Sequence, residues 1–302
     1  LFIVYKLKAT DKEQFIWNST ANNKTISIAT TDRLANLDTY KYKTYSNSVE
    51  KNKANIHFYH HNKSNLKTGD YSISIGKNTK EQLPPQVFKG FISEVLVYNR
   101  VLSIADSQKV ASYLAIKYGI TLSQLDTKNY VNSSGAVIWE YEKHKKFSDN
   151  ITAIGKDLNQ DLVQQKSSNM ANENLVAMKF RAIDSVATNY FTFWSDNNKP
   201  LLLKKQDEGF PNGISRKWIL NYENNSKSGM DWIFDLSQLE GKANEQDYYW
   251  LAIDPTGKGE FNTHSVQYVM LSKAAVKEPF TLENYNWNAA NTDQVAYTIQ
   301  IA

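Results

Sequence analysis

The sequence has no cysteine in its 302 residues and only five histidines. The lack of cysteine excludes a disulfide scaffold, a Cys-x-x-Cys metal site and a cysteine nucleophile. The sequence also lacks the Gly-x-Ser-x-Gly, P-loop, Gly-x-Gly-x-x-Gly and His-Glu-x-x-His motifs, which serve hydrolases, nucleotide-binding proteins and zinc peptidases. We therefore expect a protein that is not an enzyme.

Arginine is also scarce, since only four of the 35 basic residues are Arg. Arginine is the usual residue for bidentate contacts with phosphates and bases. The lysines alternate with apolar residues, as they do from Val4 to Lys8, which is typical of a solvated strand face. We expect no nucleic-acid partner. We also expect no membrane span, because no apolar run approaches the ~18 residues that a spanning helix requires.

Short segments with alternating apolar and polar residues fill the first hundred positions. Asn, Lys, Asp or Gly separate them at intervals of roughly ten residues, without helical patterns between them, which is typical of antiparallel sandwiches and jelly rolls. We expect strands at 1–7, 13–19, 24–30, 55–61, 71–77 and 91–99.

One helix is expected at about 103–118. Ser103 and Asp106 resemble a capping box with Asp in place of Glu, and Gly119 can supply a left-handed C-cap. We expect this helix to close the first domain. The apolar stripe at helical spacing comprises Val110, Tyr113, Leu114 and Tyr118.

A second series of strand-like segments follows the helix. The overall expectation is an all-β fold of two antiparallel β-sandwich (jelly-roll-like) domains joined by one α-helix, at 1–119 and 120–302. The expected strands of the second domain are 135–141, 151–157, 174–180, 190–196, 216–222, 231–236, 248–254, 265–271 and 294–301.

The stretch GFISEVLVYNRVLSIADSQKVASYLAIKYGI, residues 90–120, resembles the C-terminal end of concanavalin A-like, laminin-G-like domains of large bacterial surface proteins. The stretch at 130–168 resembles a β domain of unknown function that often follows such domains directly. The residues that match the closing pattern are Gly90, Glu94, Tyr98, Arg100, Leu102, Ser103, Tyr113, Leu114, Lys117, Tyr118 and Gly119.

The resemblance implies a secreted protein of the bacterial cell surface that is exported by the type IX route, as some adhesins of gliding bacteria are. It implies glycans or surface polymers as partners, and the secretion machinery as a partner during export. A complete laminin-G-like domain is longer than the ~100 residues before the closing pattern, and the chain opens at Leu1 without a signal peptide. We therefore expect an internal piece of a longer protein, without its N-terminal strands and any C-terminal sorting region.

Two loops carry candidate metal ligands, and calcium is the one cofactor we consider. Asp157, Asn159 and Asp161 have the 1, 3, 5 spacing of a calcium loop, although Leu162 and Ser168 stand where an EF-hand has Gly and Glu. Asp254 lies beside two glycines in DPTGKGEF, where a hairpin turn is an equal explanation.

Carboxylates and histidines give weaker candidates. Glu140 and Glu142 would share one face of a strand about 7 Å apart, a spacing that glycosidase pairs can use, but an exposed charged edge is the favoured interpretation. The histidines in HFYHH (57–61) are interpreted as edge-strand residues, because His57 and His61 would lie about 13 Å apart.

Aromatic residues can form platforms for sugars. Trp287 and Tyr285, in the Asn-rich stretch NYNWNAAN, are the candidate glycan-binding residues. The strand tryptophans, Trp250 among them, are assigned to the core. The preferred function is a non-catalytic module that contributes to adhesion or glycan contact. The alternatives are a fragment of a carbohydrate-active enzyme, and a structural spacer or cargo bound to its export machinery.

Overall fold

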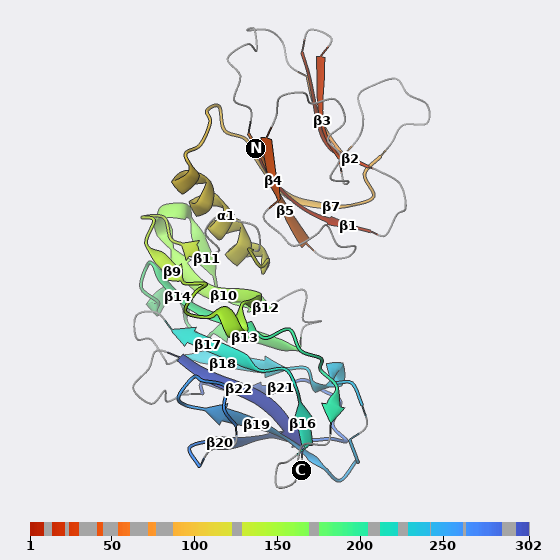
Figure 1. The fold of residues 1–302 in the computed structure, drawn as a ribbon, viewed down its shortest axis with the longest axis vertical. Helices are drawn as coiled ribbons and strands as arrows, with labels where there is room; N and C mark the ends of the chain where they lie inside the picture. The colour runs from red at the N-terminus through yellow and green to blue at the C-terminus, as the bar shows by residue number, and fades with distance from the viewer. Residues whose placement is uncertain are drawn as a thin grey trace. The chain divides into compact units, whose positions relative to one another are not determined.

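The computed structural model describes residues 1–8, 14–21, 24–29, 41–44, 54–60, 72–76, 87–122, 129–168, 175–204, 212–222, 229–241, 243–261, 264–285 and 294–301. The chain divides into two compact units, which we call unit 1 (Leu1–Ser107 and Ser123–Leu125) and unit 2 (Gln108–Leu122 and Asp126–Ala302). The described part is mostly antiparallel β-structure with one α-helix, so the expected all-β fold class is confirmed (Figure 1).

In its described part, unit 1 contains a four-stranded sheet in the order β4-β5-β1-β7 and a three-stranded sheet in the order β3-β2-β6. Its core is formed by side chains of β1 and β2, with Tyr5 and Trp17 as its largest members. The strands are β1 Phe2–Leu7, β2 Phe15–Ala21, β3 Lys24–Ala29, β4 Lys41–Thr44, β5 Ala54–His60, β6 Ser72–Ile75 and β7 Gly90–Leu96.

Helix α1 runs from Ile104 to Tyr118, and both of its ends are capped as the sequence predicts. The Asp106 amide donates to Ser103 Oγ over 3.0 Å. At the other end Gly119 has a left-handed backbone with φ of +61°, and the Ile120 amide donates to the Ala115 carbonyl over 2.9 Å. This is a Schellman-type ending, which glycine favours because it has no Cβ.

The buried face of α1 differs from the predicted apolar stripe. Of the four predicted residues only Leu114 is buried. Ala111, Ser112 and Ala115 are buried. The buried Ser112 hydroxyl is satisfied because it accepts the Val131 amide over 3.0 Å. Small residues with low hydrophobicity therefore make up much of the packed face, which a search for large apolar residues cannot find.

The helix also belongs largely to the second unit, because the division between the compact units falls after Ser107. The expected boundary at residue 119 places the whole helix in the first domain. Two contacts within unit 2 hold it there: the Ser112–Val131 hydrogen bond, and one from Gln108 Nε2 to the Asn129 carbonyl at 3.1 Å.

Unit 2 contains a nine-stranded sheet, a four-stranded sheet in the order β12-β13-β18-β21, and the pair β8-β9. The large sheet has the order β11-β10-β14-β17-β22-β16-β15, and β19 pairs with both β22 and β20. The strands in the described part of unit 2 are β8 Tyr130–Val131, β9 Val137–Trp139, β10 Asp149–Asp157, β11 Leu162–Gln164, β12 Lys166–Ser168, β13 Val176–Phe180, β14 Tyr190–Asp196, β15 Leu203–Lys204, β16 Asn212–Ile214, β17 Trp218–Tyr222, β18 Met230–Phe234, β19 Tyr248–Asp254, β20 Gln267–Lys273, β21 Phe280–Leu282 and β22 Gln294–Ile301.

The core of unit 2 lies between the two larger sheets, because one cluster of buried side chains draws on both. Its centre is aromatic: Trp218 stacks on Tyr297 with ring centroids 5.4 Å apart, and Trp232 of the smaller sheet meets Tyr297 edge-on at 6.1 Å. Trp194 also meets Trp232 edge-on, at 6.0 Å. Alternate residues of these strands are large and apolar because their side chains fill the space between the two sheets.

The opposite face of the large sheet is covered near β14 and β17 by residues 129–147. Tyr130 meets Phe193 edge-on at 5.5 Å, and His144 bonds to Asn221. Phe147 packs against Gly259, where a Cβ would lie 2.7 Å from the ring. This cover does not include β20, which lies at the margin of unit 2 beside β19 (Figure 1).

Candidate functional site

Asp157, the last residue of β10, is fully buried and surrounded by hydrogen-bond donors. One carboxylate oxygen accepts the Ser133 amide at 2.7 Å and Gln160 Nε2 at 2.9 Å. The other accepts the Ser133 hydroxyl at 2.8 Å and the Asn159 amide at 3.2 Å. The carboxylate therefore ties the turn after β10 to the loop between β8 and β9.

Asn159 and Asp161, the other candidate calcium ligands of this loop, are exposed. Asn159 lies in the short 3-10 helix Leu158–Gln160, and Asp161 ends it with a left-handed backbone, φ 56°. Asp tolerates that conformation better than most residues with a Cβ do. The 1, 3, 5 spacing thus serves a capped turn in which Asp157 accepts the Asn159 amide.

Asp254, the last residue of β19, forms a second buried centre of the same kind. One oxygen accepts the amide and hydroxyl of Thr256 at 2.9 and 2.6 Å, and the other accepts the amides of Gly259 and Glu260 at 2.8 and 3.1 Å. The glycines at 257 and 259 have φ of +71° and +76°, so the turn can fold back over the carboxylate.

These two carboxylates use their lone pairs to bind N–H and O–H groups, whereas calcium needs six to eight oxygen ligands with free lone pairs. A cation at either position would displace the hydrogen bonds that shape the turn. Across the described ranges there is no group of three or more His, Asp or Glu side chains that could hold a metal ion. The geometry of both turns is that of structural centres.

Lys217 joins the Asp254 turn to the large sheet. Its Nζ donates to the Gly259 carbonyl over 2.8 Å and lies 5.2 Å from the centre of the Phe261 ring. Burial lowers the pKa of this amine, and the nearby carboxylates of Asp254 and Glu260 partly offset that effect. The ammonium therefore contributes a positive charge close to the buried Asp254.

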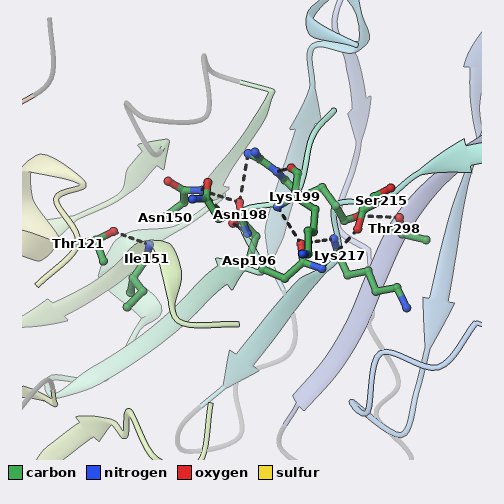
Figure 2. Close-up of polar contacts among 11 residues, drawn as sticks. Thr121, Asn150, Ile151, Asp196, Asn198, Lys199, Ser215, Lys217 and Thr298 are labelled. Atoms are coloured by element: carbon green, nitrogen blue, oxygen red, sulfur yellow. Dashed lines mark hydrogen bonds and ion pairs between the residues drawn. The ribbon is translucent and has the colours of Figure 1, made fainter. Parts of the chain in front are cut away.

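Asp196, the last residue of β14, is the third fully buried aspartate at a strand end. Figure 2 shows its network: Asn150 Nδ2 donates to the two carboxylate oxygens at 2.8 and 3.1 Å, and the Asn198 amide donates at 2.8 Å. Asn150 and Asn198 both have a left-handed backbone, each with φ of 50°, which asparagine tolerates.

A cation completes this network. Arg216 Nη1 lies 3.5 Å from Asp196 Oδ2, and the arginine and aspartate side chains are 11% and 0% exposed. Arg216 Nε also donates to the Lys199 carbonyl at 2.5 Å, and its own carbonyl accepts the Thr298 hydroxyl at 2.7 Å (Figure 2). The Asp196 network therefore joins β10, β14 and β22 to the link between β16 and β17.

His57 and His144 are buried and serve packing. His57 lies on β5, which has a neighbour on each side, so the interpretation as an edge-strand residue was wrong. Its Nε2 lies 3.0 Å from the Tyr5 hydroxyl, and burial lowers its pKa to about 4. Burial also lowers the pKa of His144, which stacks on Trp139.

The remaining sequence candidates do not form a catalytic group. Glu140 and Glu142 do not alternate on a strand, because β9 ends at Trp139 and both residues are exposed. Tyr285 is half-buried and packs against the core of unit 2, and burial raises its pKa. Trp287 lies outside the described residues, so its role as a platform stays a prediction.

Exposed aromatic residues gather instead on the outer face of β19 and β20. Tyr248, Tyr268 and Met270 are 38%, 48% and 52% exposed, and Trp250 is half-buried. Cross-strand pairing places Trp250 opposite Met270, and Ala252 opposite Tyr268, so these side chains leave the sheet on one face. We call Tyr248, Trp250, Tyr268 and Met270 the β19–β20 surface.

Comparison with known families adds one relationship. Residues 106–292, more than half of the chain, match a family described as "Domain of unknown function (DUF8202)". The chain belongs to this family. No curated protein and no solved structure matches the chain.

The DUF8202 match begins within α1, close to the point where unit 2 begins. All three buried aspartates and the β19–β20 surface lie within the DUF8202 region. This surface cannot be recognised from the sequence of β19 alone, because the inner residues Leu251 and Ile253 are as apolar as the outer ones. Nothing in the strand then indicates which face is exposed. The signal that could have found it is an aromatic residue at every second position, as at 248 and 250, in a strand that also has apolar residues between them.

Proposed function

We propose that the chain is a non-catalytic module of a secreted bacterial cell-surface protein, and that it contributes to adhesion by contact with glycans. The resemblance of residues 90–120 to laminin-G-like domains supports the surface location and export by the type IX route. No helix in the described ranges is long and apolar enough to span a lipid bilayer.

One observation carries the proposal, namely the exposure of the β19–β20 surface. Most of the large sheet buries aromatic side chains: Trp194 and Trp218 are fully buried. Only at β19 and β20 do aromatic rings of this sheet remain open to solvent among the described residues. Rings of Tyr and Trp pack against the C–H faces of sugars while their polar tips stay wet.

A glycan-array measurement tests this function. We expect the chain to bind a subset of glycans, and the Tyr268→Ala variant to bind them more weakly. Phe91→Ala is the matched control, because Phe91 is an aromatic side chain on a strand of unit 1 and is 57% exposed. Equal loss in both variants, or unchanged binding in both, would contradict the assignment to this surface.

The same measurement separates the alternatives. A spacer or export cargo would bind no glycan on the array. A carbohydrate-active enzyme would turn over a polysaccharide and lose that activity on Glu140→Gln or Glu142→Gln.

A further inference from the structure

We propose that the β19–β20 surface binds an uncharged polysaccharide, and that it does so without a metal ion. This inference rests on the proposed function and narrows it to a ligand class and a site. It is built on the register of β20, β19 and β22, on the charge of the outer face, and on one buried amide.

The register of the three strands places aromatic and amide groups in neighbouring rows. Trp250 pairs with Met270 on β20 and with Gln300 on β22. In the next row Ala252 pairs with Tyr268 and with Thr298. Directly paired residues of antiparallel strands extend on the same face, so the rings of Trp250 and Tyr268 and the amide of Gln300 leave the sheet on one face.

The outer positions of these rows carry no charge. Among the described residues, two charged side chains lie on the outer face of β19 and β20. Lys273 lies opposite Tyr248 at one end of the ladder, and Asp254 ends β19 at the other end, where it is buried in its own turn. An acidic ligand would lose its hydration here without gaining a counter-charge in the centre of the surface, which is unfavourable. A basic peptide would meet the same difficulty. Sugar rings suit the surface because they offer apolar C–H faces and hydroxyl groups without charge.

Gln300 supplies the second observation. Its side chain is 5% exposed, and Oε1 has no hydrogen-bond partner in the part of the chain that the structure describes. A buried acceptor without a donor costs free energy. A ligand hydroxyl could donate to this oxygen once the side chains that cover it move aside, and the new hydrogen bond would remove that cost. Gln300 is therefore suited to favour ligands rich in hydroxyl groups.

Metal independence follows from the two aspartate turns. Asp157 and Asp254 each accept four hydrogen bonds from N–H and O–H groups. Calcium could bind them only by breaking those bonds. Glycan binding at the β19–β20 surface should therefore be the same in calcium and in EDTA.

The test is isothermal titration calorimetry of the full chain against two polysaccharide series. The uncharged series is soluble β-glucan, mannan and xylan, and the acidic series is alginate and polygalacturonate. We expect binding within the uncharged series, none within the acidic series, and equal affinity in calcium and EDTA. Tyr268→Ala and Gln300→Leu should each weaken binding about tenfold, and Val163→Ala, an exposed apolar change on β11, should leave it unchanged.

Each other outcome has a separate meaning. Binding to the acidic series, or loss of binding in EDTA, would overturn this inference and leave the proposed function standing. Uncharged binding that Tyr268→Ala and Gln300→Leu leave intact would overturn the site. Absence of binding to both series would overturn the proposed function and this inference together. Circular dichroism of each variant separates lost binding from lost folding.

Discussion

Asp157 and Asp254 hold their buried carboxylates with direct partners that are all neutral donors, whereas Asp196 shares its site with the guanidinium of Arg216. All three end strands of the same sheet, and all are at most 1% exposed. The same residue type in the same structural position is thus stabilised in two ways.

Asp254 and Asp196 differ most clearly in how far along the sequence their hydrogen-bond partners lie. The donors to Asp254 come from residues 256–260, two to six positions away. The donors to Asp196 include Asn150 and Arg216, which are 46 and 20 positions away. A turn can fold its own amides around a carboxylate, but a carboxylate between strands needs side chains that reach it, and a charged one reaches furthest.

Removal of the cation should have the largest effect on this comparison. Arg216→Ala removes the guanidinium from beside the buried Asp196 carboxylate, and we expect it to lower the free energy of unfolding by about 3–5 kcal/mol. Urea unfolding followed by tryptophan fluorescence measures this. Arg181→Ala is the matched control. Arg181, like Arg216, forms ion pairs with carboxylates, here those of Asp231 and Glu283, but its side chain is exposed.

The control should lose much less stability, since exposed ion pairs contribute little. Equal losses in the two arginine variants would show that burial of Asp196 does not depend on Arg216. The double variant Asp196→Asn/Arg216→Met should be more stable than Arg216→Ala, because it leaves no unpaired charge.

Replacement of the two carboxylates that are held by neutral donors should have an intermediate effect. In Asp157→Asn and Asp254→Asn an NH2 group replaces one of the two accepting oxygens, and this group cannot accept hydrogen bonds from the N–H donors that face it. We expect each change to cost about 2–4 kcal/mol. Asp161→Asn, in the same loop as Asp157 but exposed, should change stability by less than about 0.5 kcal/mol. A large loss of stability for Asp161→Asn, or no loss for Asp157→Asn, would contradict the view that the Asp157 side chain shapes this turn and the Asp161 side chain does not.

The sequence predicted the strands well, because their signal is local. Every segment predicted as a strand overlaps one in the structure, and 190–196, 248–254 and 294–301 agree at both ends. The short strands β4, β8, β11, β12, β15, β16 and β21 were missed, since two to four residues carry too little alternation to stand out.

The candidate site was predicted poorly, because its residues are defined by long-range pairing. Asp157 and Asp254 were identified as special from their spacing, but spacing could not show that their ligands are N–H groups. The β19–β20 surface depends on which faces of β19 and β20 are left uncovered, and no local pattern contains that information. The arrangement of the two units as paired sandwiches stays a prediction.

His144 extends the comparison to a buried group that has no counter-charge, and it should give the smallest effect. Its Nδ1–H donates to the Glu140 carbonyl over 2.8 Å, so Nε2 accepts from Asn221 Nδ2 at 2.7 Å and the ring is neutral. Burial lowers its pKa in the folded protein, whereas the unfolded chain has the ordinary value of 6.5. Below pH 6.5 the unfolded chain therefore binds a proton that the folded protein does not, and stability falls as the pH falls.

Above pH 6.5 this group should have no effect on stability. Between pH 7.5 and 5.5 it should lower the free energy of unfolding by up to about 1.4 kcal/mol. Urea unfolding of the unchanged protein and of His144→Gln at several pH values isolates this contribution. His57 in unit 1 contributes to the pH dependence of both proteins, so its effect cancels in the difference. If the two proteins had the same pH dependence, the folded protein would carry a charged His144. Neutral acceptors such as the Glu140 carbonyl would then hold a buried cation, as neutral donors hold the buried anions of Asp157 and Asp254.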